Sequence, residues 1–267
     1  MKTHNTRIEK ALNETVFKHV QTAADRLGLE TYVIGGYVRD TFLERPRGTD
    51  IDIVTVGNGI TLAKEVIKIL PGKNNIQVFK NYGTAMIKWQ NIQLEFVGAR
   101  KESYAKNSRN PIVETGSLED DQNRRDFTVN ALAIQLNKNG FGTLLDPFNG
   151  MQDLHDGILK TPLDPDITYS DDPLRMLRAV RFATQLGFDI DKKSLASIQK
   201  NNARVGILSN ERIVEELHKI LACSKPSDGL LLLDQLGLLH LILPEITALK
   251  GIEELEGQRH KDNFYHT

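Results

Sequence analysis

Two aspartates within a short apolar strand constrain this chain more than any other feature. Asp50 and Asp52 alternate with isoleucines in the run Asp50-Ile51-Asp52-Ile53-Val54. Successive side chains of a strand project to opposite faces, so the two carboxylates share one face. Aspartate is depleted in strands, and such local conflicts are expected at functional sites. We interpret the pair as ligands of divalent metal ions that bind a phosphate substrate, the chemistry of nucleotidyl transfer. A polar edge strand facing solvent is the alternative.

A double glycine precedes this strand. The predicted strand Thr31–Ile34 leads into Gly35-Gly36-Tyr37-Val38-Arg39-Asp40, where a helix opens. Glycine permits a tight turn and lets a phosphate approach the backbone amides. Alone, the glycine pair is a weak signal that a simple turn explains equally well. Arg39 either holds a phosphate or pairs with Asp40 or Asp50, and the nearby aspartates favour a functional interpretation.

A third acid would complete a metal site. Glu95 interrupts the apolar run Leu94-Glu95-Phe96-Val97 and is the best candidate. A two-metal site would activate an attacking 3′-hydroxyl and stabilise the leaving pyrophosphate.

A second motif carries adjacent arginines, in Asn123-Arg124-Arg125-Asp126-Phe127-Thr128-Val129-Asn130-Ala131. Guanidinium groups grip phosphate oxygens bidentately, which suits a triphosphate. Asn130 either binds a ribose hydroxyl or caps a turn. A charged surface patch is the alternative, but Phe127 and the apolar residues after Asn130 indicate a segment anchored in the core.

A third motif, Ser170-Asp171-Asp172-Pro173-Leu174-Arg175, continues to Arg178 and Arg181. Asp172 before proline is typical of a helix N-cap. Asp172 and Arg175 also lie one turn apart, so they can present an acceptor and a donor side by side. This pattern matches the exposed edges of cytosine and adenine, but not those of guanine and uracil. Both interpretations can hold together.

The chain divides into two predicted parts, residues 1–155 and 156–267. The first is an α/β domain with a mixed sheet, and the second is all-helical. We expect strands over Thr31–Ile34, Ile51–Val56, Ile76–Phe79, Thr84–Trp89, Ile92–Val97 and Ala131–Leu136. Expected helices cover residues 8–28, Ile60–Leu70, Leu174–Leu186, Lys193–Lys200, Glu211–Ala222 and Ser227–Leu239.

The composition limits which binding partners and which cellular compartment we expect for this protein. The 267 residues include one cysteine, Cys223, and carry a formal net charge of -1. No apolar run is long enough to cross a bilayer and no signal-peptide core is present, so we expect a cytoplasmic protein without a membrane partner. Any RNA contact must come from local patches. The sequence leaves the oligomeric state open.

Taken in order, these motifs resemble those of the class II nucleotidyltransferases, the family of bacterial-type CCA-adding tRNA nucleotidyltransferases and related poly(A) polymerases. The resemblance covers most of residues 30–222 and rests on GGYVRD, DIDIV, RRDFTVNALA, LLDPFNGMQDL, DDPLRMLRAVRFATQLGF and SNERIVEELHKIL. It implies a polymerase-β-like catalytic head, a helical neck and partial body, and Mg²⁺ in a two-metal site. The implied partners are a tRNA 3′ end, CTP and ATP.

The resemblance also assigns roles by position. Asp50 and Asp52 would hold the metals, with Glu95 as the third carboxylate. Nucleotide contacts would come from Gly35, Gly36, Arg39, Arg125, Asp126 and Asn130, and base selection from Asp172 and Arg175 with Arg178 nearby. The family usually has glutamate where this chain has Asp171, a departure from which we expect little harm.

Two further segments bear on the activity. The polar stretch Arg100–Asp121 resembles the family's flexible loop, which helps to switch selection from C to A, and favours full CCA addition over CC addition. The final Phe264-Tyr265-His266-Thr267 resembles the start of an HD phosphohydrolase domain, with His266 in place of its first metal-binding histidine. Poly(A) addition, partial tRNA addition and a non-catalytic RNA-binding relative are the alternatives to CCA addition.

Overall fold

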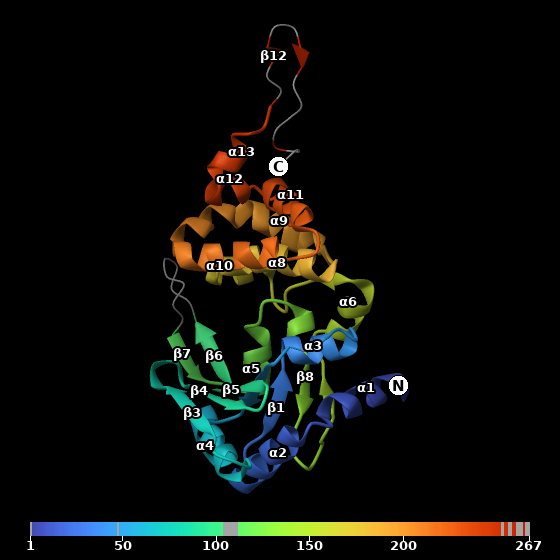
Figure 1. Ribbon diagram of the computed structural model, residues 1–267, viewed down its shortest axis with the longest axis vertical. Coiled ribbons are helices and arrows are strands. Elements are labelled where there is room, and N and C mark those ends of the chain that lie inside the picture. Colours follow the sequence, from blue (N-terminus) through green and yellow to red (C-terminus); the bar gives the residue numbers. More distant parts are fainter. Residues whose placement is uncertain are drawn as a thin grey trace. The chain divides into compact units, whose positions relative to one another are not determined.

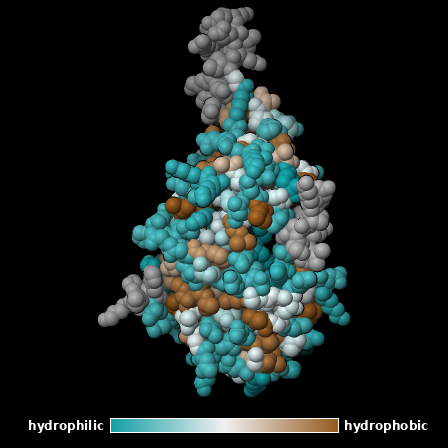
Figure 2. Space-filling view, turned by 180° about the vertical axis from the view of Figure 1, so that it is seen from behind, coloured by the Kyte–Doolittle hydropathy of each residue, from teal (hydrophilic) through white to brown (hydrophobic). Residues whose placement is uncertain are grey.

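The computed structural model describes residues 2–46, 48–103, 112–251, 254–255, 258–259 and 264. It contains two compact units, of which the first ends at Asp156 and the second begins at Gly157. Among the described residues, none of the helices combines the length and the apolar character needed to span a bilayer. The face drawn in Figure 2 is mainly hydrophilic, with separate hydrophobic patches.

The first unit is built on a seven-stranded mixed sheet in the order β3-β4-β5-β2-β1-β8-β9 (Figure 1). Strand β2 pairs in parallel with β5 and antiparallel with β1, so it lies inside the sheet. The predicted mixed sheet is therefore confirmed. The strands are β1 Thr31–Ile34, β2 Asp50–Thr55, β3 Asn75–Phe79, β4 Thr84–Trp89, β5 Ile92–Gly98, β8 Ala133–Gln135 and β9 Leu144–Leu145.

Helices and a separate hairpin complete this unit. Helices α2 and α4 pack against each other and bury apolar side chains such as Phe17 and Leu62. The helices are α1 Lys2–Leu12, α2 Thr15–Leu27, α3 Gly36–Phe42, α4 Gly59–Ile69, α5 Leu118–Asn123 and α6 Gly150–Asp156. The unit also contains two 3₁₀ turns, η1 Lys80–Tyr82 and η2 Thr128–Asn130. The hairpin is formed by strands β6 Arg100–Ser103 and β7 Ile112–Thr115.

Three sequence-based expectations for this unit need correction. The single helix expected over residues 8–28 is two helices, α1 and α2. Glu14, between them, is extended and occupies the N-cap position of α2. Helix α1 packs against α3, whereas α2 packs against α4. The strand expected from Ala131 begins at Ala133, since η2 occupies the residues just before it. The stretch Arg100–Asp121, expected as a loop, contains β6, β7 and the start of α5; its residues 104–111 lie outside the described part.

The second unit is mostly helical, in agreement with the predicted all-helical part except for two short pairs of strands. Strands β10 Ile158–Leu159 and β11 Asp189–Ile190 form a parallel pair. Its helices are α7 Pro165–Asp171, α8 Leu174–Leu186, α9 Lys192–Asn201, η3 Asn202–Ile207, α10 Asn210–Leu221, α11 Pro226–Gln235, α12 Leu239–Ile242 and α13 Pro244–Thr247. A short antiparallel pair, β12 Glu254–Leu255 and β13 Gln258–Arg259, follows them.

The helix expected over Ser227–Leu239 ends early. Gly237 adopts a left-handed φ of 67°, a conformation in which helices commonly end. The backbone N–H groups of Gly237 and Leu238 donate back to the carbonyls of Asp234 and Leu233. These bonds satisfy the last carbonyls of α11 and let the chain restart as α12.

A buried ion pair joins α8 to α10. Arg181 Nη1 lies 3.2 Å from Glu216 Oε2, and the two side chains are only 9% and 3% exposed. The Arg181 guanidinium also lies 4.1 Å from the centre of the Phe182 ring. Removing one partner of such a pair leaves a buried charge without its counter-charge, which is costly.

We therefore expect Glu216→Ala to destabilise the second unit by about 3 kcal/mol. The matched control is Glu215→Ala, which removes the same side chain from the neighbouring, exposed position of α10. Thermal unfolding followed by circular dichroism measures both variants. Equal melting temperatures for the two would contradict the role given to the pair.

Candidate active site

The two aspartates of the opening motif lie on an interior strand. Asp50 is exposed and Asp52 half-buried, whereas Ile51 and Ile53 between them are buried. This alternation places both carboxylates on one face of β2, as predicted. The edge-strand alternative is wrong, because β2 has neighbouring strands on both sides.

Glu95 lies beside Asp52. The two residues are register partners in the parallel pair β2–β5, so their side chains project to the same face. Although the Glu95 side chain is largely accessible, partial desolvation raises the pKa of its carboxyl. The charges of Asp52 and Asp50 raise this pKa further, against an opposing effect of Arg100. The three acids therefore interact electrostatically across the two strands.

These acids do not form a ready-made cage. Within the described part of the chain, no group of three or more His, Cys, Asp or Glu side chains is arranged to hold a metal ion. Mg²⁺, however, commonly binds through one or two carboxylates and completes its shell with water and substrate phosphates. The mutual repulsion of the acids and the hard oxygen donors of Asp50 and Asp52 fit that mode of binding.

Gly35 lies close to one of these acids and to an arginine of the second motif. It has a φ of 84°, which favours glycine, and it directly follows β1. A Cβ atom added to Gly35 would lie 3.2 Å from both Asp52 Oδ2 and Arg125 Nη1. The Asp52 carboxylate and the Arg125 guanidinium thus both lie close to Gly35. Gly36 is less restricted, since a Cβ there would lie 3.6 Å from Arg39 Nη2.

Arg39 is buried and belongs to a polar network beneath the glycine turn. Its Nε and Nη2 donate to Asp40 at 2.9 and 3.0 Å, and its Nη1 donates to Asn130 Oδ1 at 2.8 Å. Asn130 Nδ2 in turn donates to Asp126 Oδ1 at 3.0 Å. Of the partners considered from sequence, Asp40 is the one that the structure pairs with Arg39 through two hydrogen bonds. Arg39, Asp126 and Asn130 therefore brace one another.

The adjacent arginines converge on an acid that sequence reasoning overlooked. Asp121, in α5, is fully buried and accepts hydrogen bonds from both Arg124 and Arg125. Burial alone would raise the pKa of the Asp121 carboxyl, but the charges of Arg125 and Arg124 outweigh it and lower this pKa. The signal was present in the sequence, because the acid precedes the arginines by three and four residues, the spacing of helical neighbours.

The motif LLDPFNGMQDL, which sequence reasoning quoted without a role, anchors η2. Asp146 accepts from the backbone N–H groups of Gly150 and Met151 at the start of α6. Thr128 donates from its hydroxyl to Asp153 at 2.6 Å. A Cβ on Gly150 would lie 2.5 Å from the Thr128 carbonyl oxygen, so only glycine permits this close approach. The motif therefore holds the segment that ends in Asn130.

The base-selecting candidates occupy the second unit. Asp172 Oδ1 accepts from the Leu174 N–H at 3.2 Å, which confirms the capping contact, although α8 itself begins at Leu174. Arg175 Nη1 donates to the Thr168 carbonyl at 3.4 Å, and the Arg178 guanidinium lies 5.4 Å from the centre of the Phe182 ring. Arg175 and Arg178 are half-buried and lie one turn apart on α8, and Asp172, also half-buried, is extended just before the helix.

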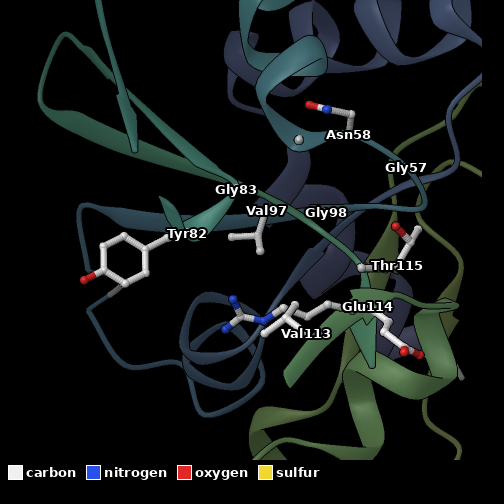
Figure 3. A pocket seen from close by; sticks show the side chains of 12 residues that line it. Gly57, Asn58, Tyr82, Gly83, Val97, Gly98, Val113, Glu114 and Thr115 are labelled. Atoms are coloured by element: carbon white, nitrogen blue, oxygen red, sulfur yellow. The ribbon is translucent and has the colours of Figure 1, made fainter. Parts of the chain in front are cut away.

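A pocket of about 350 Å³ lies elsewhere in the first unit (Figure 3). Its lining includes Asn58, Tyr82, Val113 and Gly98, the last residue of β5. Asp50 is instead the register partner of Gln93, near the start of β5. The pocket therefore lies at the end of β5, whereas Asp50 lies level with its start.

His266, which resembles the first metal-binding histidine of an HD domain, lies outside the described residues.

Comparisons with known proteins agree with these features. The chain matches the family described as "Poly A polymerase head domain" over residues 31–160, and that described as "Probable RNA and SrmB- binding site of polymerase A" over residues 187–250. It is 39% identical to an A-adding tRNA nucleotidyltransferase of Aquifex aeolicus over 71% of this chain and 23% of that protein. It is 38% identical to a CCA-adding enzyme of Geobacillus sp. (strain WCH70) over 79% of this chain and 50% of that protein.

The chain thus spans between about a quarter and a half of the length of these curated relatives. Among solved structures, it resembles a tRNA nucleotidyltransferase complexed with a primer tRNA and an incoming ATP analogue. The TM-score is 0.72 and the identity 31%, and the match covers 86% of this chain and 67% of that one. By these matches, the chain belongs to the class II nucleotidyltransferases, the family of CCA-adding tRNA nucleotidyltransferases and related poly(A) polymerases.

Proposed function

We propose that this chain carries the catalytic part of an enzyme that adds C, C and A to tRNA 3′ ends, using CTP, ATP and Mg²⁺. The observation that supports the proposal is the closeness of Gly35 to Asp52 and Arg125, since Asp52 Oδ2 and Arg125 Nη1 each lie 3.2 Å from where a Cβ atom of residue 35 would stand. In this proposal Asp52 would bind metal and Arg125 would bind phosphate, next to a glycine turn whose backbone a phosphate could approach. The single cysteine, Cys223, is in keeping with a reducing cytoplasm.

The residues of the first unit would divide the work of transfer. Asp50 and Asp52 would hold the metal ions, with Glu95 as a third carboxylate. When bound, these ions would activate the 3′-hydroxyl and stabilise the leaving pyrophosphate. Arg125 and the backbone of Gly35 and Gly36 would orient the triphosphate.

A buried network would support those contacts. Arg39, Asp126 and Asn130 already bond to one another or to Asp40, so they would hold the glycine turn in place under the nucleotide. Such bracing keeps a site in its productive geometry, which is where much of the rate acceleration in positioning-dependent reactions originates.

The second unit would select the base. Asp172 and Arg175 present a carboxylate and a guanidinium one helical turn apart, and Arg178 continues the same face. A carboxylate accepts from the exocyclic amine that cytosine and adenine share, while a guanidinium donates to a ring nitrogen or a carbonyl. Side chains, and not a nucleic-acid template, would then choose CTP and ATP.

Two related activities are the alternatives. Some relatives of comparable identity are A-adding tRNA nucleotidyltransferases and others are CCA-adding enzymes. Poly(A) addition is the second alternative, because the matched head domain is named for poly(A) polymerase.

Three tRNA substrates separate these activities: one lacking the CCA end, one ending in C and one ending in CC. A CCA-adding enzyme is expected to incorporate CTP on the first two and a single ATP on the third. An A-adding enzyme would use only the third substrate, and a poly(A) polymerase would extend any of them with many A residues. Failure to incorporate C under all conditions would refute CCA addition.

We expect Asp52→Asn to abolish nucleotide incorporation while leaving tRNA affinity within about twofold of the wild-type value, since removing a metal ligand affects the chemical step. Incorporation is measured with labelled CTP and tRNA affinity by filter binding. Wild-type incorporation by this variant would overturn the metal assignment.

We expect Arg175→Ala to reduce discrimination of CTP and ATP against GTP and UTP by about tenfold or more, because one donor to the base is lost. The matched control is Arg212→Ala, at an exposed position of α10. Unchanged preference in Arg175→Ala, measured as kcat/KM for each nucleotide, would show that Arg175 only packs or caps.

A further inference from the structure

Asp121 is a fully buried carboxylate to which the proposed reaction gives no task. Its Oδ1 accepts from Arg124 Nε at 2.9 Å and Nη2 at 2.5 Å. Its Oδ2 accepts from Arg125 Nε at 3.3 Å and Nη2 at 3.2 Å. One carboxylate therefore binds two guanidinium groups, each through two nitrogens.

This arrangement fixes the direction of Arg125. A guanidinium is planar, so a two-nitrogen contact with a carboxylate determines its orientation as well as its distance. Because Nε and Nη2 face Asp121, Nη1 is the remaining nitrogen, and it points to the Asn130 carbonyl at 3.5 Å and to the Gly35 turn. Asp121 thus determines that Nη1 is the Arg125 nitrogen directed at the turn.

Arg124 is held on two sides. In addition to Asp121, its Nη1 donates to Glu102 Oε1 at 3.3 Å. The Glu102 side chain is only 4% exposed, and the same oxygen lies 2.9 Å from Arg100 Nε. Two buried acids therefore share the charge of Arg124, and this residue connects strand β6 to helix α5.

We propose that Asp121 positions Arg125 for the triphosphate, and that Glu102 supports this positioning through Arg124. Both acids are positioning residues that act on the nucleotide through an arginine. The proposal rests on the proposed function, in which Arg125 binds the triphosphate. It adds two acids of the polar stretch Arg100–Asp121 to the residues that determine nucleotide affinity.

The direction in which a charge-removing substitution changes triphosphate affinity distinguishes positioning from a simple electrostatic effect. Asp121→Asn and Glu102→Gln each remove a negative charge close to the arginines that face an anionic ligand. Coulomb's law alone predicts that either substitution tightens triphosphate binding. Positioning predicts that triphosphate binding weakens. A guanidinium that has lost its carboxylate partner must be ordered by the nucleotide itself, which costs binding free energy.

The experiment measures the dissociation constant of CTP with Mg²⁺ by isothermal titration calorimetry, using the whole chain. We expect Glu102→Gln to weaken binding about threefold and Asp121→Asn about tenfold, with the double variant no weaker than Asp121→Asn because the two residues act in one network. The matched controls are Glu114→Gln on β7 and Glu119→Gln on α5, both at exposed positions, and neither is expected to weaken binding.

Unfolding temperatures measured in parallel show whether a variant is folded. If Asp121→Asn fails to fold, Glu102→Gln decides the matter by itself. A folded Glu102→Gln protein that binds CTP as tightly as the wild type, or more tightly, overturns the proposal. Wild-type protein that binds CTP but transfers no nucleotide would instead refute the proposed function, while the affinity ratios still test the positioning. Wild-type protein that fails to bind CTP would overturn both.

Discussion

The interior place of β2 in the sheet is the constraint on which the candidate site depends. Pairing with β5 runs over the whole of β2, from Asp50 to Thr55, and pairing with β1 on the other side covers Asp52 to Thr55. The register sets Ile34 opposite Asp52, so the residue after Ile34 arrives beside that carboxylate. The same ladder on the other side brings Glu95 next to Asp52. Three sequence segments thus meet because of strand pairing alone.

Arginines near β2 form ion pairs with acids. Arg39 faces Asp40, Arg124 lies between Asp121 and Glu102, and Arg125 shares Asp121. Buried guanidinium groups need such partners, since an unpaired charge in the interior is costly. Arg125 is left with one nitrogen directed at the glycine turn. The arrangement of charge at the site therefore comes from the placement of these residues and not from the composition of the chain, whose formal net charge is -1.

The sequence predicted the parts of the site that depend on local patterns. Strand alternation gave the common face of Asp50 and Asp52, and the proline after Asp172 indicated the capping contact with Leu174. Partner choice was harder to predict, because Arg39 had several acids within reach and only the fold brings Asn130, 91 residues away, to its Nη1.

The role of Asp121 was missed for a different reason. The spacing of three and four residues between the acid and the arginines is visible in the sequence, but helix α5 is only six residues long and mostly polar, so no apolar periodicity predicts the helix that makes them neighbours. The hairpin β6–β7 was missed in the same polar stretch. The break between α1 and α2 was also hidden, because each helix packs against a different partner and apolar spacing alone does not reveal a change of partner.

Gly35 has a consequence for how the chain tolerates change. Alanine at this position would leave every charged group of the site in the sequence, yet its methyl carbon would come within 3.2 Å of the Asp52 carboxylate and the Arg125 guanidinium. Under the proposed function, the added carbon would compete with the triphosphate for the same space, as a permanently attached inhibitor would. Position 35 therefore requires a residue without a side chain. A screen that looks only for the loss of charged residues would not detect this requirement.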